Sequence, residues 1–161
     1  MSTVGWEPDT FGHAGYLPQL LRQAGIKYYY HSREENHPVR VPVYWWEGID
    51  GSRLLSFDEG VTNWYMGSPD MVYTDLKAMK ERSGVNTALT IVGVGNHGGA
   101  PSREMIEKGL EIAAKPYLST IKFGTAEEFF KDLETRNNLS ELEVFRGELN
   151  PVFSGGTMKN E

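Results

Sequence analysis

A glycine-rich stretch with a histidine inside it is the first candidate for chemistry in this sequence. It covers residues 91–101, reads IVGVGNHGGAP, and contains a G-x-G-x-x-G pattern directly after an apolar run. Glycines in such a loop can bring bare backbone to the phosphates of a dinucleotide. They can equally leave space for a substrate to reach His97, because a histidine with an unperturbed pKa of roughly 6.5 suits proton transfer near neutral pH.

The residues around this loop argue against nucleotide binding. The dinucleotide pattern requires an Asp or Glu about 20 residues further on, at the end of the next strand. The next expected strand ends at Phe123 with no carboxylate there, and Glu111 lies in an expected helix. No Lys-Ser/Thr pair follows the glycines, as a phosphate-binding P-loop would require. The loop therefore predicts either a plain strand-to-helix turn or a substrate site around His97.

The elements that would position such a site alternate between short apolar strands and amphipathic helices. Strands are expected at Thr3–Glu7, Ile26–His31, Val41–Glu47, Arg53–Phe57, Thr87–Val94, Leu118–Phe123 and Glu143–Phe145. Helices are expected at Leu17–Ala24, residues 68–83, Ser102–Ala114 and Thr125–Arg136. Asp50-Gly51 is a hairpin turn signal between two of these strands. The alternation predicts an α/β fold, with a mostly parallel sheet flanked by helices and one β-hairpin.

Polar residues follow three of the expected strands. Asp9 comes after the first strand and Arg33 after the second. Asn96 and His97 come after the strand that leads into the glycine-rich stretch. Because sites in parallel sheets lie at the carboxyl ends of the strands, we expect these groups to share one edge of the sheet.

Composition excludes several classes of function. The 161 residues carry a net charge of −6 with acidic and basic residues mixed along the chain, so we expect no nucleic-acid partner. The chain has no cysteine, which rules out disulfides and thiolate zinc sites. Its N-terminus lacks a signal-peptide pattern, and no apolar run approaches the ~20 residues of a membrane span. We expect a chain that acts in the cytoplasm and does not enter a membrane.

Four blocks of sequence, in order, resemble the glycoside hydrolase family 38 α-mannosidases of the bacterial and cytosolic type. They are WEPDTFGHAGYLPQ with the following LLRQAGIKYYYHSR (residues 6–33), YWWEGIDGSRLL (44–55), GVGNHGGAPSREMIE (93–107) and GELNPVFSGGT (147–157). The resemblance implies that residues 1–150 are part of a catalytic α/β domain, as a piece of an irregular seven-stranded (β/α) barrel. It also implies that residues 151–161 begin a linker to a helical domain, truncated here.

The same resemblance implies a metal-dependent retaining hydrolase that acts on α-mannosides or mannose-containing oligosaccharides. Asp9 falls on the family's catalytic nucleophile, which is also a zinc ligand, and Arg33 falls on an arginine that steadies the nucleophile and the sugar. A retaining glycosidase forms a covalent bond to the sugar through such a carboxylate, and needs a second group about 5–5.5 Å away as acid and then base. His13 matches a histidine of some members, without an assigned role. The full-length enzyme could also form a homo-oligomer.

Two features depart from the family pattern. The family's zinc site uses an upstream His-x-Asp and a downstream His that this chain lacks, so the other ligands would lie outside it. We therefore expect an internal fragment of a longer enzyme, which alone is poorly soluble, binds zinc weakly and is inactive on aryl α-mannosides. Asn96-His97 stands where many relatives carry the acid/base Asp. Either His97 donates the proton, or both residues bind substrate while another carboxylate donates it, with Glu47 and Asp50 as local candidates.

Two other functional classes remain open from the sequence. A metal-dependent carbohydrate deacetylase would also place an early Asp at a strand end, and would release acetate rather than mannose. A non-catalytic carbohydrate-binding piece would explain the abundant aromatic residues. For Trp45 and Trp46 we expect core packing, with one ring on each face of the strand. His31 and His37 are expected to be surface or loop histidines.

Overall fold

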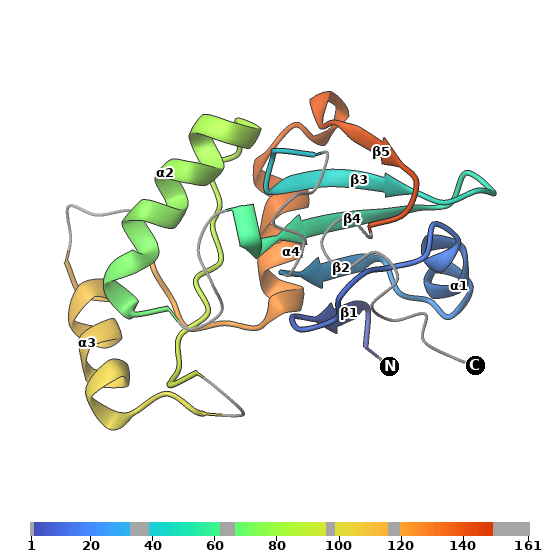
Figure 1. Ribbon diagram of the computed structural model, residues 1–161. Helices are drawn as coiled ribbons and strands as arrows, with labels where there is room; N and C mark the ends of the chain where they lie inside the picture. The colour runs from blue at the N-terminus through green and yellow to red at the C-terminus, as the bar shows by residue number, and fades with distance from the viewer. Residues whose placement is uncertain (1, 33–38, 62–66, 96–98, 116–119, 150–161) are drawn as a thin grey trace.

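The computed structural model describes residues 2–32, 39–61, 67–95, 99–115 and 120–149 (Figure 1). Its strands are β1 (Val4–Glu7), β2 (Tyr28–His31), β3 (Val43–Glu47), β4 (Arg53–Asp58) and β5 (Val144–Arg146). Its α-helices are α1 (Leu17–Gln23), α2 (Val72–Ser83), α3 (Arg103–Ala113) and α4 (Ala126–Arg136), and its short 3-10 helices are η1 (Glu59–Val61), η2 (Pro69–Met71) and η3 (Leu139–Glu141). None of the helices in these ranges is long and apolar enough to cross a membrane.

The described strands form one sheet in the order β1-β2-β4-β3-β5. Pairings β1–β2, β2–β4 and β3–β5 are parallel, and β3–β4 is the antiparallel hairpin. The predicted α/β class, the mostly parallel sheet and the hairpin are therefore confirmed. The seven-stranded barrel stays a prediction, because the described part of the chain forms an open five-stranded sheet (Figure 1).

Local sequence signals explain where several elements begin and turn. Helix α4 starts with the predicted capping box, in which the Thr125 hydroxyl accepts from the Glu128 amide and the Glu128 carboxylate accepts from the Thr125 amide. In the hairpin loop, the Asp50 carboxylate accepts from the amide and hydroxyl of Ser52. Gly51 beside it has a φ of 83°, a left-handed conformation that favours glycine. These side chains shape the fold and are not free for chemistry.

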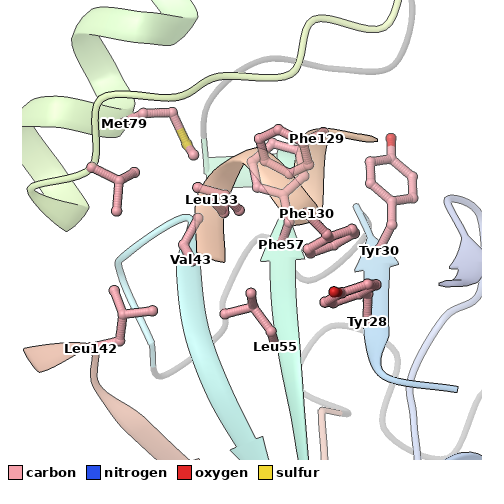
Figure 2. Packing of buried hydrophobic residues seen from close by; sticks show 11 residues of the cluster. Tyr28, Tyr30, Val43, Leu55, Phe57, Met79, Phe129, Phe130, Leu133 and Leu142 are labelled. Carbon is pink, nitrogen blue, oxygen red and sulfur yellow. The ribbon is translucent and has the colours of Figure 1, made fainter. Parts of the chain in front are cut away.

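Helices cover both faces of the sheet, and alternation along each strand decides which side chains meet them. On one face, α4 and α2 pack on aromatic and aliphatic residues of β2, β3 and β4, among them Tyr28, whose ring stacks on Phe130 at 4.8 Å between centroids (Figure 2). The opposite face carries Tyr29, Tyr44 and Trp46 against α1. Trp45 and Trp46 lie on opposite faces as predicted, and both contribute to packing.

Two expected strands are wrong. Residues 87–94 make one isolated parallel bridge, between Val92 and Gly67, instead of joining the sheet. Besides the backbone bonds of this bridge, two side-chain carboxylates hold the segment: Thr90 donates to Asp75, and the Ile91 amide bonds to Glu59. The second is the expected strand Leu118–Phe123. Its residues 120–123 form no strand, and residues 116–119 lie outside the described part.

Candidate functional site

Asp9 lies where the sequence placed it, in the turn directly after β1. Its side chain is exposed, and β1 runs parallel to β2 and, through it, to β4. The turn therefore stands at the edge where the carboxyl ends of three strands meet, the edge on which α/β proteins build sites. Arg33, Asn96 and His97 lie outside the described residues, so their places in the site stay predictions.

A row of titratable side chains crosses the sheet at this edge. Glu7, His31 and Asp58 are direct neighbours in register, one from each parallel strand. His31 Nε2 lies 2.7 Å from the Tyr44 hydroxyl, its Nδ1 lies 4.0 Å from Asp58 Oδ1, and Asp58 also accepts from the Gly60 amide. The expectation that His31 is a surface or loop histidine is wrong: it is fully buried, with its ring hydrogen-bonded to Tyr44 of β3 and close to the Asp58 carboxylate of β4.

A second polar cluster joins the two ends of the turn that carries Asp9. The Tyr29 hydroxyl donates to Glu7 Oε2 at 2.9 Å and lies 2.7 Å from His13 Nδ1. His13 Nδ1 is itself 3.3 Å from the same Glu7 oxygen. Tyr29 and His13 are buried, whereas Glu7 is only partly covered. Glu7 and His13 lie on either side of Asp9 in the sequence, and Tyr29 of β2 joins them.

On the other face of the same edge, Glu59 is a buried acid that follows β4. It accepts a hydrogen bond from the Tyr30 hydroxyl, and the Tyr30 ring stacks on Trp6 with centroids 3.7 Å apart. Burial, with the nearby charges of Asp75 and Asp58, raises the pKa of Glu59 to about 8, although the bond from Tyr30 opposes that rise. Glu59 therefore holds its proton at neutral pH.

Glu47 and Asp50, the local carboxylates considered as acid/base, lie at the opposite edge. Glu47 ends the antiparallel strand β3 and Asp50 follows it, so the length of β4 separates them from the Asp9 edge, about 17 Å at the usual rise per residue. Glu47 pairs with Arg146 and Arg53, whose hydrogen bonds lower its pKa. Hydrogen bonds from Ser52 lower the pKa of Asp50. Neither carboxylate therefore lies near Asp9, and the lowered pKa of each disfavours its use as a proton donor.

The described residues do not form a complete metal centre. Among them, no three His, Asp or Glu side chains come together in a way that could hold an ion. An exposed carboxylate such as that of Asp9 is a suitable oxygen ligand for zinc. A zinc ion with Asp9 as one ligand would therefore need its other ligands from outside these residues.

The carboxyl edge of this mostly parallel sheet carries carboxylates, histidines and aromatic rings. This is the arrangement in which α/β enzymes build their active sites. The family "Glycosyl hydrolases family 38 N-terminal domain" matches residues 1–155. The chain belongs to that family. This membership favours a glycosidase over the deacetylase considered from the sequence.

Individual relatives match nearly the whole chain. Alpha-mannosidase 2C1 of Homo sapiens is 27% identical over 161 residues, 98% of this chain and 15% of that protein. Alpha-mannosidase of Saccharomyces cerevisiae is 31% identical over 171 residues, 99% of this chain and 16% of that protein. In structure, an alpha-mannosidase from Enterococcus faecalis V583 matches with a TM-score of 0.70 at 23% identity, over 93% of this chain and 18% of that one, which supports the fold. The chain thus spans less than a fifth of the length of these relatives.

Sequence reasoning missed the buried polar groups at the edge, above all Asp58 and Glu59. Both end or follow an expected strand, so the rule that singled out Asp9 applied to them as well. Glu7 and His31 close expected strands in the same way. The signal was present, but which of these residues are buried depends on partners from other strands.

Proposed function

We propose that this chain is part of a retaining α-mannosidase and that Asp9 is its nucleophile. The observation that carries the proposal is the position of Asp9, exposed in the turn after β1, in a chain that the family matches over residues 1–155. The names of the relatives support mannose-containing substrates. The cytoplasm is the compartment we propose, since a chain without cysteine cannot form the disulfides that an oxidising compartment would allow.

The proposed chemistry has two steps. A carboxylate oxygen of Asp9 attacks the anomeric carbon, the bond to the leaving oxygen breaks, and that oxygen takes a proton from an acid. Water then attacks the same carbon, gives a proton to the same group, and restores the Asp9 carboxylate. Arg33 is proposed to steady Asp9 and the sugar, Asn96 to bind substrate and His97 to be the acid. A zinc ion with Asp9 as one ligand would hold and orient sugar hydroxyls.

A chimera gives the sharpest test of Asp9. Residues 1–155 replace the matching segment of the Enterococcus faecalis α-mannosidase, and hydrolysis of 4-nitrophenyl α-mannoside is measured. We expect an active chimera whose Asp9→Asn variant loses on the order of 10⁴-fold or more in kcat, as other enzymes do without their nucleophile. Asp70→Asn, a change at an exposed carboxylate of η2, is the control and should change little. Full activity of Asp9→Asn would refute the proposal.

The same chimera tests His97 as the proton donor. A good leaving group needs little protonation, so His97→Ala should slow an alkyl mannoside far more than the 4-nitrophenyl compound. Equal losses on both substrates would rule out the donor role and leave His97 with substrate binding. For the 161-residue chain alone, we expect no turnover of aryl α-mannosides.

A further inference from the structure

The turn that carries Asp9 is held at both ends by one hydrogen-bond cluster. Glu7 lies two residues before Asp9, and His13 lies four residues after it. Both meet the same atom, the hydroxyl oxygen of Tyr29, at 2.9 and 2.7 Å. Tyr29 is fully buried in the sheet, so this hydroxyl is a fixed point to which the two ends of the turn are tied.

The geometry also assigns the proton on His13. Tyr29 has one hydroxyl proton, and it donates that proton to Glu7. His13 Nδ1 must therefore be the donor in its 2.7 Å contact with the Tyr29 oxygen, and it also lies within reach of Glu7 at 3.3 Å. A neutral histidine in water prefers the proton on Nε2. The cluster thus predicts a proton on His13 Nδ1, which can be read from the NMR signals of the ring nitrogens.

The chain near residue 149 fixes the downstream end of the turn a second time. The His13 amide donates to the Leu149 carbonyl at 2.7 Å, and the Leu149 amide returns a bond to His13 at 2.9 Å. A β-carbon on Gly15 would lie 3.3 Å from the carbonyl carbon of Gly147, so the two backbones are in close contact there. Trp46 Nε1 donates to the Gly147 carbonyl at 3.0 Å and ties this segment to the sheet.

We infer that Glu7, Tyr29 and His13 act as positioning residues for Asp9, a clamp that fixes the direction of its carboxylate. The inference rests on the proposed role of Asp9 as nucleophile. A reacting carboxylate must be held within about 0.5 Å of its productive position. Asp9 lies in an exposed turn, and the hydrogen-bonded residues on either side of it hold that turn in place. The clamp residues themselves do not take part in bond making.

Variants of the clamp remove the polar atoms of one side chain at a time. Tyr29→Phe deletes the shared hydroxyl and keeps the ring. His13→Leu deletes the ring nitrogens, whereas His13→Asn keeps a nitrogen donor attached to Cγ, where Nδ1 stood, and should rescue. Tyr44→Phe is the matched control, because it deletes another buried hydroxyl of the same face, one that bonds to His31 instead.

The first measurement uses the 161-residue chain, fused to a soluble carrier protein because we expect it to be poorly soluble alone, and labelled for NMR. In the unchanged chain we expect a protonated His13 Nδ1 and slow hydrogen exchange at the His13 and Leu149 amides. Tyr29→Phe and His13→Leu should speed that exchange about tenfold, the usual effect of one lost hydrogen bond, relative to the Leu55 amide in β4. Tyr44→Phe and His13→Asn should not. Equal exchange in Tyr29→Phe and Tyr44→Phe, or a His13 ring protonated only on Nε2, would overturn the clamp.

The second measurement uses the chimera. Tyr29→Phe should lower kcat about tenfold or more with KM within twofold, because a misdirected nucleophile still allows the sugar to bind. A purely structural loss would lower the amount of folded enzyme and leave kcat per active site unchanged, which would overturn the positioning role. If Asp9→Asn keeps full activity in the chimera while the exchange contrast holds, the proposed nucleophile fails and the clamp on the turn stands.

Discussion

Glu59 should make the fold lose stability as the pH rises through neutrality. Its carboxyl group is 2% exposed and faces Tyr30, the Ile91 amide and the carboxylates of Asp58 and Asp75. Burial is the largest cause that raises its pKa from 4.5 to about 8. The folded chain therefore keeps a proton that the unfolded chain releases near pH 4.5. Stability falls wherever the folded state binds more protons, between about pH 4.5 and 8, and levels off above.

The size of the effect follows from the two pKa values. A rise from 4.5 to about 8 corresponds to roughly 5 kcal/mol when the full window is crossed, at about 1.4 kcal/mol per pH unit. By pH 7 roughly 3 kcal/mol should already be lost. Domains of this size are stable by about 5–15 kcal/mol, so the effect is a large share of the total. Glu59→Gln keeps an oxygen that can accept from Tyr30 but cannot ionise.

The assay is urea unfolding at pH 5, 6, 7 and 8, followed by tryptophan fluorescence. The free energy of unfolding of the unchanged chain should fall relative to that of Glu59→Gln at each step, by roughly 3 kcal/mol between pH 5 and 7 and further at pH 8. Glu107→Gln, at an exposed glutamate of α3, should follow the unchanged chain. Parallel curves for the unchanged chain and Glu59→Gln would refute the reasoning, because they would mean that Glu59 ionises equally easily in both states.

Two further predictions concern α4. Phe130→Ala should lower the free energy of unfolding by about 3–5 kcal/mol, measured by urea unfolding, because the ring is fully buried and stacked on Tyr28. Thr125→Ala should cost about 1 kcal/mol through loss of the capping box. Thr135→Ala, at a threonine whose hydroxyl bonds back to Lys131 within the helix, is the control and should cost less than Thr125→Ala.

The sequence predicted what depends on neighbours along the chain. The capping box at Thr125, the turn at Asp50 and the place of Asp9 after β1 each follow from residues a few positions apart. The two faces of the Trp45-Trp46 pair follow from strand alternation alone. Such features need no knowledge of which strands pair.

What the sequence could not predict depends on partners that are distant in the chain. His31 is buried because Tyr44 and Asp58 come to it from two other strands. Residues 87–94 look like a buried strand, yet the segment joins no strand of the sheet, and Asp75 holds its Thr90 hydroxyl while Glu59 holds its Ile91 amide. Apolar runs of this length do not reveal whether backbone or side chains will satisfy their amides.

Strand β2 connects the two parts of the candidate site. Tyr29 and Tyr30 are neighbours, so their side chains point to opposite faces of the sheet. The Tyr29 hydroxyl ties down the turn of Asp9, and the Tyr30 hydroxyl binds Glu59, which bonds to Ile91, the first residue of the glycine-rich stretch. A shift of β2 by one residue would exchange these two faces and release both. The run of three tyrosines is therefore more than core packing: two adjacent hydroxyls fix the segments that lead to Asp9, the proposed nucleophile, and to His97, the proposed acid.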